Sequence, residues 1–303
     1  MSYGFYAKGS AGNLILGDDN PVLVLKHSKA MKVARRHSWV ESQRRGSSKN
    51  GFWYQEVLVE PCGYGFIEET YPAPITSAEP PYIFATPNGE YNGGGIGGFV
   101  HKGGPGNWIG FEMIFAYDLY YTKIMSKGAI VGQPTGWTYH LCSYGAEPSK
   151  DSYGLRLWDG NSRLVFDSGW RIVPFRELLH NWVPESNDPT RWYNIQHYWG
   201  KRVSGGDVDY VYQVGFHPWG YENHQRGVLI SSLQAHDFRG DTGSNDSAVL
   251  RCIPIIGFKG RDRARIFCSI AYGVLQHPYA AVSVMSKYQI LSGDFSKAYK
   301  PPV

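Results

Sequence analysis

Two pairs of glutamates in this 303-residue sequence are candidates for acid–base chemistry. Glycoside cleavage needs two carboxylates at a set separation across a cleft, and Glu56 with Glu60, or Glu68 with Glu69, would supply such a pair. Consecutive residues of a strand point to opposite faces, however, so Glu68 and Glu69 are poorly placed to share a cleft. No Gly-x-Ser-x-Gly segment offers a serine nucleophile. We therefore expect no catalytic residues and a protein that is not an enzyme, with hydrolysis the weakest of three interpretations.

Histidine and cysteine are too scattered to indicate a metal or redox site. His217 and His224 share one turn-rich stretch and His236 precedes Asp237, but no His-x-His or His-Glu-x-x-His spacing occurs. The cysteines form no Cys-x-x-Cys pair, and two of them lie in apolar runs that favour buried thiols. We expect no metal, no cofactor and reduced cysteines, as in a protein made in a reducing cytoplasm. The cysteines are Cys62, Cys142, Cys252 and Cys268.

One glycine-rich segment matches the spacing of a nucleotide-binding loop, Gly-x-Gly-x-x-Gly. That fingerprint requires a strand before it and a helix after it, whereas here glycine, proline and asparagine lie on both sides. Nine glycines occur from Gly93 to Gly110, so we predict a long pliable loop instead. In an assembly, such a loop would contact a neighbouring subunit. The glycines of this candidate interface loop are Gly93, Gly94, Gly95, Gly97 and Gly98.

The strongest charge feature is a basic stretch over residues 26–49, in which eight cations accompany a single acid, Glu41. It predicts a basic surface that meets an acidic partner subunit. Nucleic acid, anionic surface sugar or phosphate, and a merely solvated face are the alternatives. The whole chain carries 30 Lys+Arg and 26 Asp+Glu, a net charge of +4, which is too small for a general nucleic-acid binder, so we expect no nucleic-acid partner. The eight cations are Lys26, Lys29, Lys32, Arg35, Arg36, Arg44, Arg45 and Lys49.

Aromatic residues are abundant, with 14 Phe, 10 Trp and 22 Tyr. At alternate strand positions such side chains usually fill the core between two sheets. Trp219 and Tyr221 differ, because they lie in a Gly/Pro turn, where an exposed ring can stack on a sugar. They are the candidate glycan-stacking residues, and a host-surface glycan is the partner that they would bind.

The elements that position these residues are predicted to be strands. The 37 Gly and 18 Pro disfavour long helices, and short runs of β-branched and aromatic residues recur between turn-forming residues. Residues 174–182 alone have apolar side chains in helical register and predict one or two turns of helix. We therefore expect an all-β fold. The predicted strands are residues 52–60, 82–86, 108–117, 129–131, 137–142, 192–198, 208–216, 228–233, 249–258, 265–272 and 281–290.

The sequence contains an internal repeat at a constant offset of 150 residues. Residues 2–16 read SYGFYAKGSAGNLIL and residues 152–166 read SYGLRLWDGNSRLVF, so that Ser, Tyr, Gly and Leu recur at matching positions. Each copy predicts a strand, a turn and a second strand. We therefore expect two antiparallel β-sandwich-like domains with little helix, residues 1–150 and 151–303, joined by a linker at residues 147–151.

The second copy resembles the start of a group of tailed-bacteriophage tail proteins encoded among the tail-tip and fibre genes. The resemblance lies in Tyr153-Gly154-Leu155, in Leu164-Val165-Phe166 and in the turn Asp167-Ser168. The first copy departs from the family pattern, because it has Leu16-Gly17-Asp18 where the family has an aromatic or aliphatic residue and then Asp-Ser. The resemblance implies a virion structural protein and carries no catalytic residues.

From this resemblance we expect a structural component of a phage tail tip or baseplate, located in the virion tail after synthesis in the host cytoplasm. Its partners would be other tail proteins and further copies of the chain. A carbohydrate-binding, receptor-recognition module of the tail is the alternative. No stretch approaches the ~18 apolar residues of a membrane span, and the first residues lack the apolar core of a signal peptide.

Overall fold

The structure is a computed structural model of the chain. Within the described residues there is one 3₁₀ turn, η3 (Ile230–Ser232), and no α-helix. No described helix therefore has the length and apolar character that crossing a membrane requires. The prediction of an all-β fold is confirmed. The described residues are 6–8, 14–17, 22–36, 40–48, 51–58, 64–88, 92–116, 131–145, 147–180, 182, 197–198, 210–218, 226–234, 236–241, 247–259, 263–271 and 289–295.

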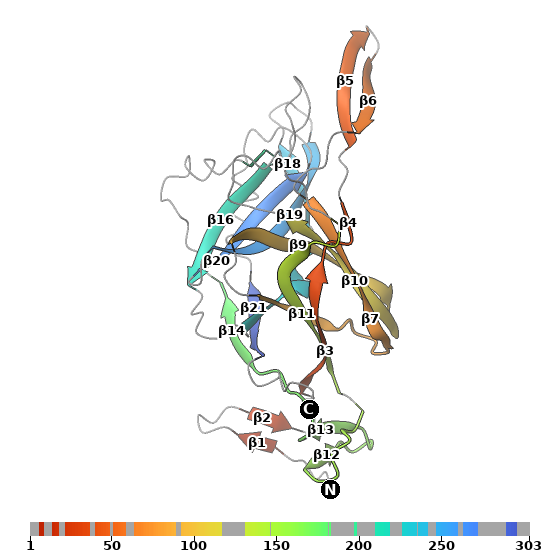
Figure 1. The fold of residues 1–303 in the computed structure, drawn as a ribbon, viewed down its shortest axis with the longest axis vertical. Helices are drawn as coiled ribbons and strands as arrows, with labels where there is room; N and C mark the ends of the chain where they lie inside the picture. Colours follow the sequence, from red (N-terminus) through yellow and green to blue (C-terminus); the bar gives the residue numbers. More distant parts are fainter. Residues whose placement is uncertain are drawn as a thin grey trace.

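Two antiparallel sheets form the body of the protein (Figure 1). The larger sheet has nine strands, and its order along the main path is β15-β16-β20-β19-β9-β10-β7-β4, with β18 also paired to β19. Its strands are β4 (Arg35–Arg36), β7 (Tyr64–Ile75), β9 (Asn92–Gly104), β10 (Asn107–Ala116), β15 (His197–Tyr198), β16 (Tyr210–Pro218), β18 (His236–Asp241), β19 (Ser247–Lys259) and β20 (Arg263–Ala271).

The smaller sheet has six strands in the order β14-β21-β17-β8-β11-β3, and three further hairpins are β1–β2, β5–β6 and β12–β13. Its strands are β3 (Leu23–Lys32), β8 (Tyr82–Pro87), β11 (Pro134–Tyr144), β14 (Phe175–Leu179), β17 (Arg226–Leu229) and β21 (Ile290–Asp294). The hairpins are β1 (Tyr6–Lys8) with β2 (Leu14–Gly17), β5 (Val40–Ser48) with β6 (Gly51–Leu58), and β12 (Arg156–Trp158) with β13 (Leu164–Asp167).

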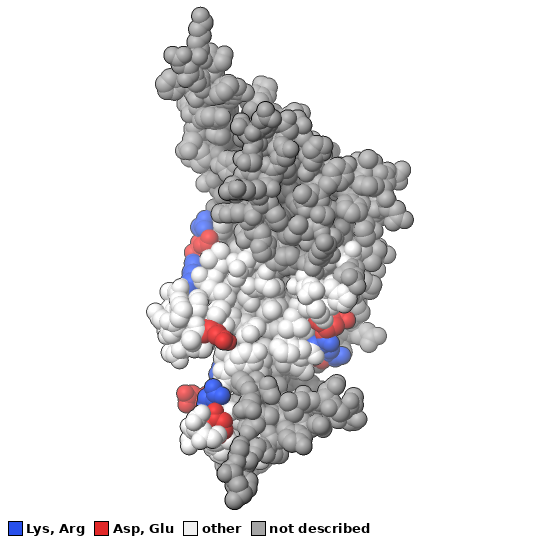
Figure 2. Space-filling model, turned by 180° about the vertical axis from the view of Figure 1, so that it is seen from behind, with Lys and Arg blue, Asp and Glu red and all other residues white. Residues whose placement is uncertain are grey.

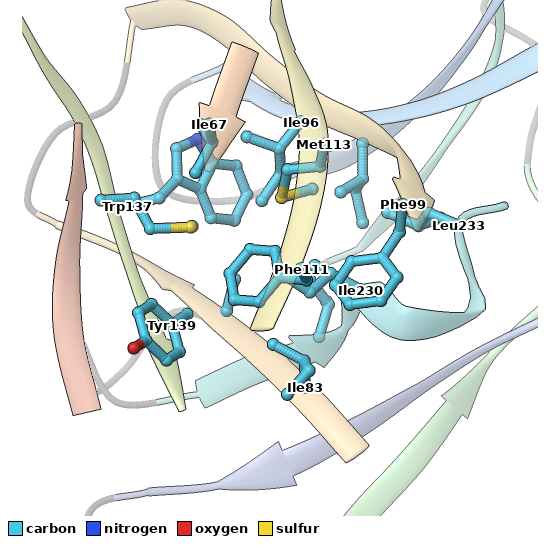
Figure 3. Packing of buried hydrophobic residues seen from close by; sticks show 14 of the residues in the cluster. Ile67, Ile83, Ile96, Phe99, Phe111, Met113, Trp137, Tyr139, Ile230 and Leu233 are labelled. Atoms are coloured by element: carbon cyan, nitrogen blue, oxygen red, sulfur yellow. The ribbon is translucent and has the colours of Figure 1, made fainter. Parts of the chain in front are cut away.

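The two large sheets bury one apolar layer between them, which we call the inter-sheet core (Figure 3). Because side chains alternate along a strand, β10 directs Phe111, Met113 and Phe115 into this layer. Trp137 and Tyr139 of β11 enter it from the smaller sheet. The Phe111 and Tyr139 rings meet edge-on with their centroids 5.2 Å apart. Interlocking aromatic side chains therefore join the sheets, as in other β-sandwiches.

A second buried layer covers the outer face of the smaller sheet. His140 lies there, stacked on Phe295 with ring centroids 4.1 Å apart. Its Nδ1 is 2.8 Å from the Ser28 hydroxyl and its Nε2 is 3.0 Å from the Thr86 hydroxyl. Burial lowers the pKa of His140 to about 3, so the imidazole is neutral and has a structural role. The apolar residues of this layer are Leu23, Phe84, Cys142, Val173 and Phe295.

Both large sheets combine strands from the two halves of the chain. In the larger sheet β9 pairs with β19, and in the smaller sheet β8 pairs with β17. The predicted domains, residues 1–150 and 151–303, therefore do not each form a sandwich of their own among the described residues. Local turn signals predict where strands begin and end, but the backbone pairing that decides domain organisation joins residues far apart in sequence.

The glycine-rich segment is a strand rather than the predicted loop. Gly95 pairs with Ala116 on one side and with Gly257 on the other, and Gly97 pairs with Ile114 and Ile255. β9 is thus the seam at which strands of the first half meet strands of the second half. The residues predicted to form an interface loop, all within β9, are Gly93, Gly94, Gly95, Gly97 and Gly98.

At two of these positions the structure requires glycine, at Gly97 because of a close backbone contact and at Gly98 because of a positive φ. A Cβ atom on Gly97 would lie 1.9 Å from the Pro254 carbonyl oxygen, so only glycine allows β9 and β19 to approach this closely. Gly98 has φ 61°, in the left-handed region, at a register shift between β9 and β10. At this bulge the Phe99 N–H turns to donate a 2.8 Å hydrogen bond to the Leu233 carbonyl.

The predicted helix over residues 174–182 is also wrong, because β14 is a strand paired with β21. Leu178 and Leu179, which a helix would place on one side, point to opposite faces of the sheet. Leu179 is buried in the inter-sheet core and Leu178 is exposed. Pairing with an existing sheet edge outweighs the helical register of a nine-residue segment.

We predict that Gly97→Ala lowers the free energy of unfolding by about 1–3 kcal/mol, because the added methyl group must separate β9 from β19. Urea unfolding measures the change. Gly104→Ala, in the same strand but with no atom within 4 Å of the added Cβ, is the control and should shift the value by less than about 0.5 kcal/mol. Equal effects of the two substitutions would contradict the close-packed seam.

Candidate functional site

The described residues of the basic stretch lie on three different strands rather than on one continuous element. The β5–β6 hairpin extends away from the two large sheets, which carry β3 and β4 (Figure 1). Lys49 lies outside the described residues. The other seven cations are Lys26, Lys29 and Lys32 on β3, Arg35 and Arg36 on β4, and Arg44 and Arg45 on β5.

Arg35 is the centre of a charge network on the outer face of the larger sheet. Glu68 of β7 lies directly opposite Glu112 of β10, a like-charge pair that would by itself destabilise the sheet. Arg35 lies between these carboxylates, with its Nε 2.5 Å from Glu68 Oε1 and its Nη2 2.8 Å from Glu112 Oε1. Lys102 Nζ adds a contact of 3.3 Å to Glu68. The hydrogen bond from Arg35 holds the pKa of Glu68 below its usual range.

Carboxylates that are distant in sequence therefore neutralise part of the basic stretch. The basic stretch itself contains one acid, Glu41. Arg35 nevertheless binds glutamates of β7 and β10, and Lys29 binds Glu69 of β7. In the view of Figure 2, the described cations lie beside described anions, and most of the remaining described surface is uncharged. Lys26, whose charge interacts with that of Glu147, and Lys32 are the other exposed lysines of β3. The basic interface is smaller than the sequence indicates.

Glu68 and Glu69 point to opposite faces of the larger sheet, as predicted. Glu68 belongs to the outer charge network, whereas Glu69 is buried between the sheets and accepts a 2.7 Å hydrogen bond from Lys29 Nζ. This ion pair connects β7 of the larger sheet to β3 of the smaller sheet. The two adjacent carboxylates cannot flank one glycosidic bond, because the sheet separates them.

Two buried tyrosines of the inter-sheet core, Tyr71 and Tyr139, were not predicted from the sequence. The hydroxyls of Tyr71 and Tyr139 are buried without a hydrogen-bond partner within the described structure. Burial raises the pKa of both phenols, and the nearby Glu69 charge raises that of Tyr139 further, so both are neutral. The sequence could have predicted that Tyr71 is on the same face of the strand as Glu69. Ile67, Glu69 and Tyr71 are alternate residues of β7, and alternate residues lie on one face.

The second repeat copy forms a compact unit, residues 147–172, which we call the second-copy module. Asp167 is its centre. This buried carboxylate accepts hydrogen bonds from the N–H groups of Ser149 (2.9 Å) and Gly169 (2.8 Å), the Ser149 hydroxyl (2.9 Å) and Arg156 Nε (2.8 Å). Burial opposes ionisation, but these four donors outweigh it and hold the pKa of Asp167 well below its usual range.

The motif residues of this module each have a structural role. Gly154 has φ 141°, and a Cβ there would lie 2.3 Å from Ser168 Oγ, which explains the glycine after Tyr153. Ser168 Oγ in turn accepts the Leu155 N–H at 3.0 Å. Leu164, Phe166 and the buried Trp170 of the module pack against Val22 and Val24. These contacts attach the module to the start of β3.

Both copies of the repeat form the same hairpin. In the first copy Tyr6 pairs with Gly17, Ala7 with Leu16 and Lys8 with Leu14; in the second, Arg156 pairs with Asp167, Leu157 with Phe166 and Trp158 with Leu164. Every partner is displaced by the same 150 residues, and both hairpins have their irregularity at the equivalent step. The repeat in the sequence is thus matched by a repeat of backbone pairing.

The second-copy module displays large apolar side chains on a hydrogen-bonded frame. Tyr153 is 89% exposed, Trp158 54% and Leu155 50%. The sequence could have predicted this exposed surface, because Tyr153 and Trp158 lie in a segment rich in Ser, Gly and Asp. The predicted glycan-stacking residues, Trp219 and Tyr221, lie outside the described residues.

Neither a metal centre nor a known family directs the assignment of function. No three His, Cys, Asp or Glu side chains within the described ranges are grouped so that they could hold a metal ion. The chain matches no protein-family model, no curated protein and no solved structure.

We predict that Arg35→Ala lowers the free energy of unfolding by about 1 kcal/mol at low salt, because Glu68 and Glu112 then repel each other with only the longer contacts of Lys102 to offset the repulsion. The loss should shrink in 1 M salt, where the Debye length is ~3 Å. Adding Glu112→Gln to the variant should restore stability, and Lys32→Ala, an exposed lysine of β3, is the control. A loss that salt and Glu112→Gln leave unchanged would contradict the network.

We predict that Asp167→Asn destabilises the second-copy module by about 2–4 kcal/mol at pH 7, since it removes the charge that binds Arg156 and two backbone N–H groups. Because the folded pKa is the lower one, the contribution of Asp167 is complete above the usual pKa of ~3.9 and is lost as pH falls below it.

Hydrogen exchange of residues 149–169 at pH 7 and at pH 3 measures this effect. The control is Asp151→Asn, an exposed aspartate of the same segment. If both variants protect these amides as well as the native chain does, Asp167 is not the centre of the module.

Proposed function

We propose that the protein is a structural component of a phage tail tip or baseplate and acts through protein–protein assembly with other tail proteins and with copies of itself. The proposal places the chain in the virion tail. It requires no catalytic residue, metal or cofactor. Its mechanism is surface complementarity between a two-sheet body and neighbouring subunits.

The observation that carries this proposal is the second-copy module. Its residues are those that resemble the tail proteins, and the structure divides them by role. Asp167 and Ser168 build the frame, Leu164 and Phe166 attach it to β3, and Tyr153 is left almost fully exposed.

A module of this kind suits assembly. Large, exposed aromatic side chains are the usual anchors of protein interfaces, because they bury much area while losing few rotamers. A chain that carries the same hairpin twice, in the same register, presents a related backbone unit at two places. Both features support a role in assembly with neighbouring subunits.

A carbohydrate-binding, receptor-recognition module is the second candidate. The observation that favours it is again the exposure of Tyr153 and Trp158, because aromatic rings that face solvent on a rigid frame can stack on sugar rings. The two candidates differ in the partner that these rings bind, a tail protein or a glycan.

We predict that the native chain is present in purified tails of a phage that encodes it, as measured by mass spectrometry. The double variant Tyr153→Ser/Trp158→Ser should be incorporated at least about tenfold less, since each tenfold loss corresponds to ~1.4 kcal/mol of binding free energy. The exposed rings contribute little to folding, so circular dichroism of the variant should be unchanged.

The control is Val100→Ser/Ile109→Ser, which removes two exposed apolar side chains from the large sheet instead. Absence of the native chain from purified tails would contradict a virion role. Normal incorporation of the Tyr153/Trp158 variant, together with loss of binding on a glycan array, would favour the carbohydrate-binding module.

A further inference from the structure

β14 is the last strand on one side of the smaller sheet. It pairs with β21, and no described strand pairs with its other side (Figure 1). An edge strand offers unpaired backbone N–H and C=O groups to another chain, and natural proteins usually protect such edges with charged side chains or prolines. Whether β14 is protected in this way depends on its side chains, which read FRELL.

The two charged side chains of β14 protect the edge only in part, because both are bound within their own sheet, although Arg176 remains 60% exposed and Glu177 41% exposed. Arg176 Nε donates to Asp294 Oδ2 of β21 at 2.9 Å, and Glu177 forms an ion pair with Arg226 of β17. The other two side chains near the edge are apolar and open to solvent: Phe175 is 49% exposed and Leu178 is 41% exposed.

A bulge places both apolar side chains on one face. The register of β14 against β21 shifts between Phe175 and Glu177, which changes the alternation of side chains. Leu179 points into the inter-sheet core, so Leu178 points to the outer face. Phe175 is on that face as well, because its ring lies 6.5 Å from Phe84 of the outer buried layer.

We propose that β14 pairs antiparallel with β14 of a second copy of this chain, around a twofold axis, so that the two smaller sheets become one continuous sheet. The inference rests on the proposed assembly function and names one of its contacts. A twofold interface must be self-complementary. The register that sets Phe175 opposite Leu178 of the second copy also sets Arg176 opposite Glu177, and the axis produces each pair twice.

Neighbouring registers lack this complementarity. A shift by one residue in either direction sets Phe175 opposite Glu177 or Leu178 opposite Arg176, so both apolar pairs are lost. It also sets Arg176 opposite Arg176 or Glu177 opposite Glu177, and like charges directly opposite each other are destabilising. One register therefore satisfies the apolar pairs and the charges together, and its occupant is a second FRELL strand.

The predicted contact is weak and reversible. Cross-strand pairs contribute ~0.2–1 kcal/mol each, and one short strand buries less than the ~1,000 Å² of a permanent interface. We expect dimers of the isolated chain at concentrations of about 10–100 μM, and stronger pairing where an assembly holds several copies together.

Sedimentation velocity of the full chain between about 1 and 200 μM tests the proposal. The native chain should form dimers, and Leu178→Lys should raise the dissociation constant at least about tenfold, because it inserts a charge among the apolar pairs. The matched control is Ile109→Lys, since Ile109 is also 41% exposed but lies on the larger sheet. A native chain that stays monomeric, or equal effects of the two lysines, overturns the proposal.

Cysteine cross-linking tests the register without relying on the lysine variant. Opposite residues of antiparallel strands have Cα atoms ~4.5–5.5 Å apart, within the range of a disulfide. A mixture of Phe175→Cys chains and Leu178→Cys chains should therefore oxidise to a covalent dimer, whereas either variant alone should not. Cross-linking of each variant alone, or none in the mixture, overturns the register.

The test of dimerisation through β14 and the test of the tail role can fail independently. A chain that is found in purified tails but does not dimerise through β14 leaves the tail role standing and removes this contact. A chain that dimerises through β14 but is absent from tails retains the contact and removes the tail role.

Discussion

The close approach of two backbones, β9 and β19, is the constraint on which the rest of the structure depends. At Gly97 the space beside the strand is taken by the Pro254 carbonyl, so no side chain fits between them. Through this contact the strands of the first half, β4, β7 and β10, and those of the second half, β16, β19 and β20, become one sheet. The inter-sheet core can form only when that sheet is complete, because both halves contribute residues to it.

The charged residues follow from the same arrangement. Once β7 and β10 are paired, Glu68 and Glu112 face each other, and Arg35 on the neighbouring strand β4 binds both. On the opposite face of β7, Glu69 binds Lys29 across the edge of the sandwich. Two of the cations of the basic stretch, Arg35 and Lys29, thus stabilise the fold. Exposed apolar and aromatic side chains are a further feature of the described surface that is available for binding.

Among the described residues, two of the places with exposed apolar side chains differ in chemistry. The second-copy module displays Tyr153 and Trp158 on a frame centred on Asp167, and β14 displays Phe175 and Leu178 along an open strand edge. The first suits a partner with a shaped surface or a sugar, and the second suits a partner that supplies a strand. Both kinds of contact are suited to a subunit that binds several neighbours in a larger assembly.

The sequence by itself determined the all-β class, most strand positions such as Tyr82–Pro87 and Asn107–Ala116, the repeat, and the opposite orientation of Glu68 and Glu69. These follow from local preferences, from the alternation of side chains and from comparison of the chain with itself. The strands β3, β7 and β9 escaped prediction because lysines, prolines and glycines interrupt their patterns. Only the tertiary structure decided that Gly93–Gly98 form a seam, that residues 174–182 hold a strand, and that glutamates of β7 and β10 neutralise Arg35 and Lys29. Each of these depends on pairing between residues that are far apart in the chain, and no local pattern records which strand becomes the neighbour of another.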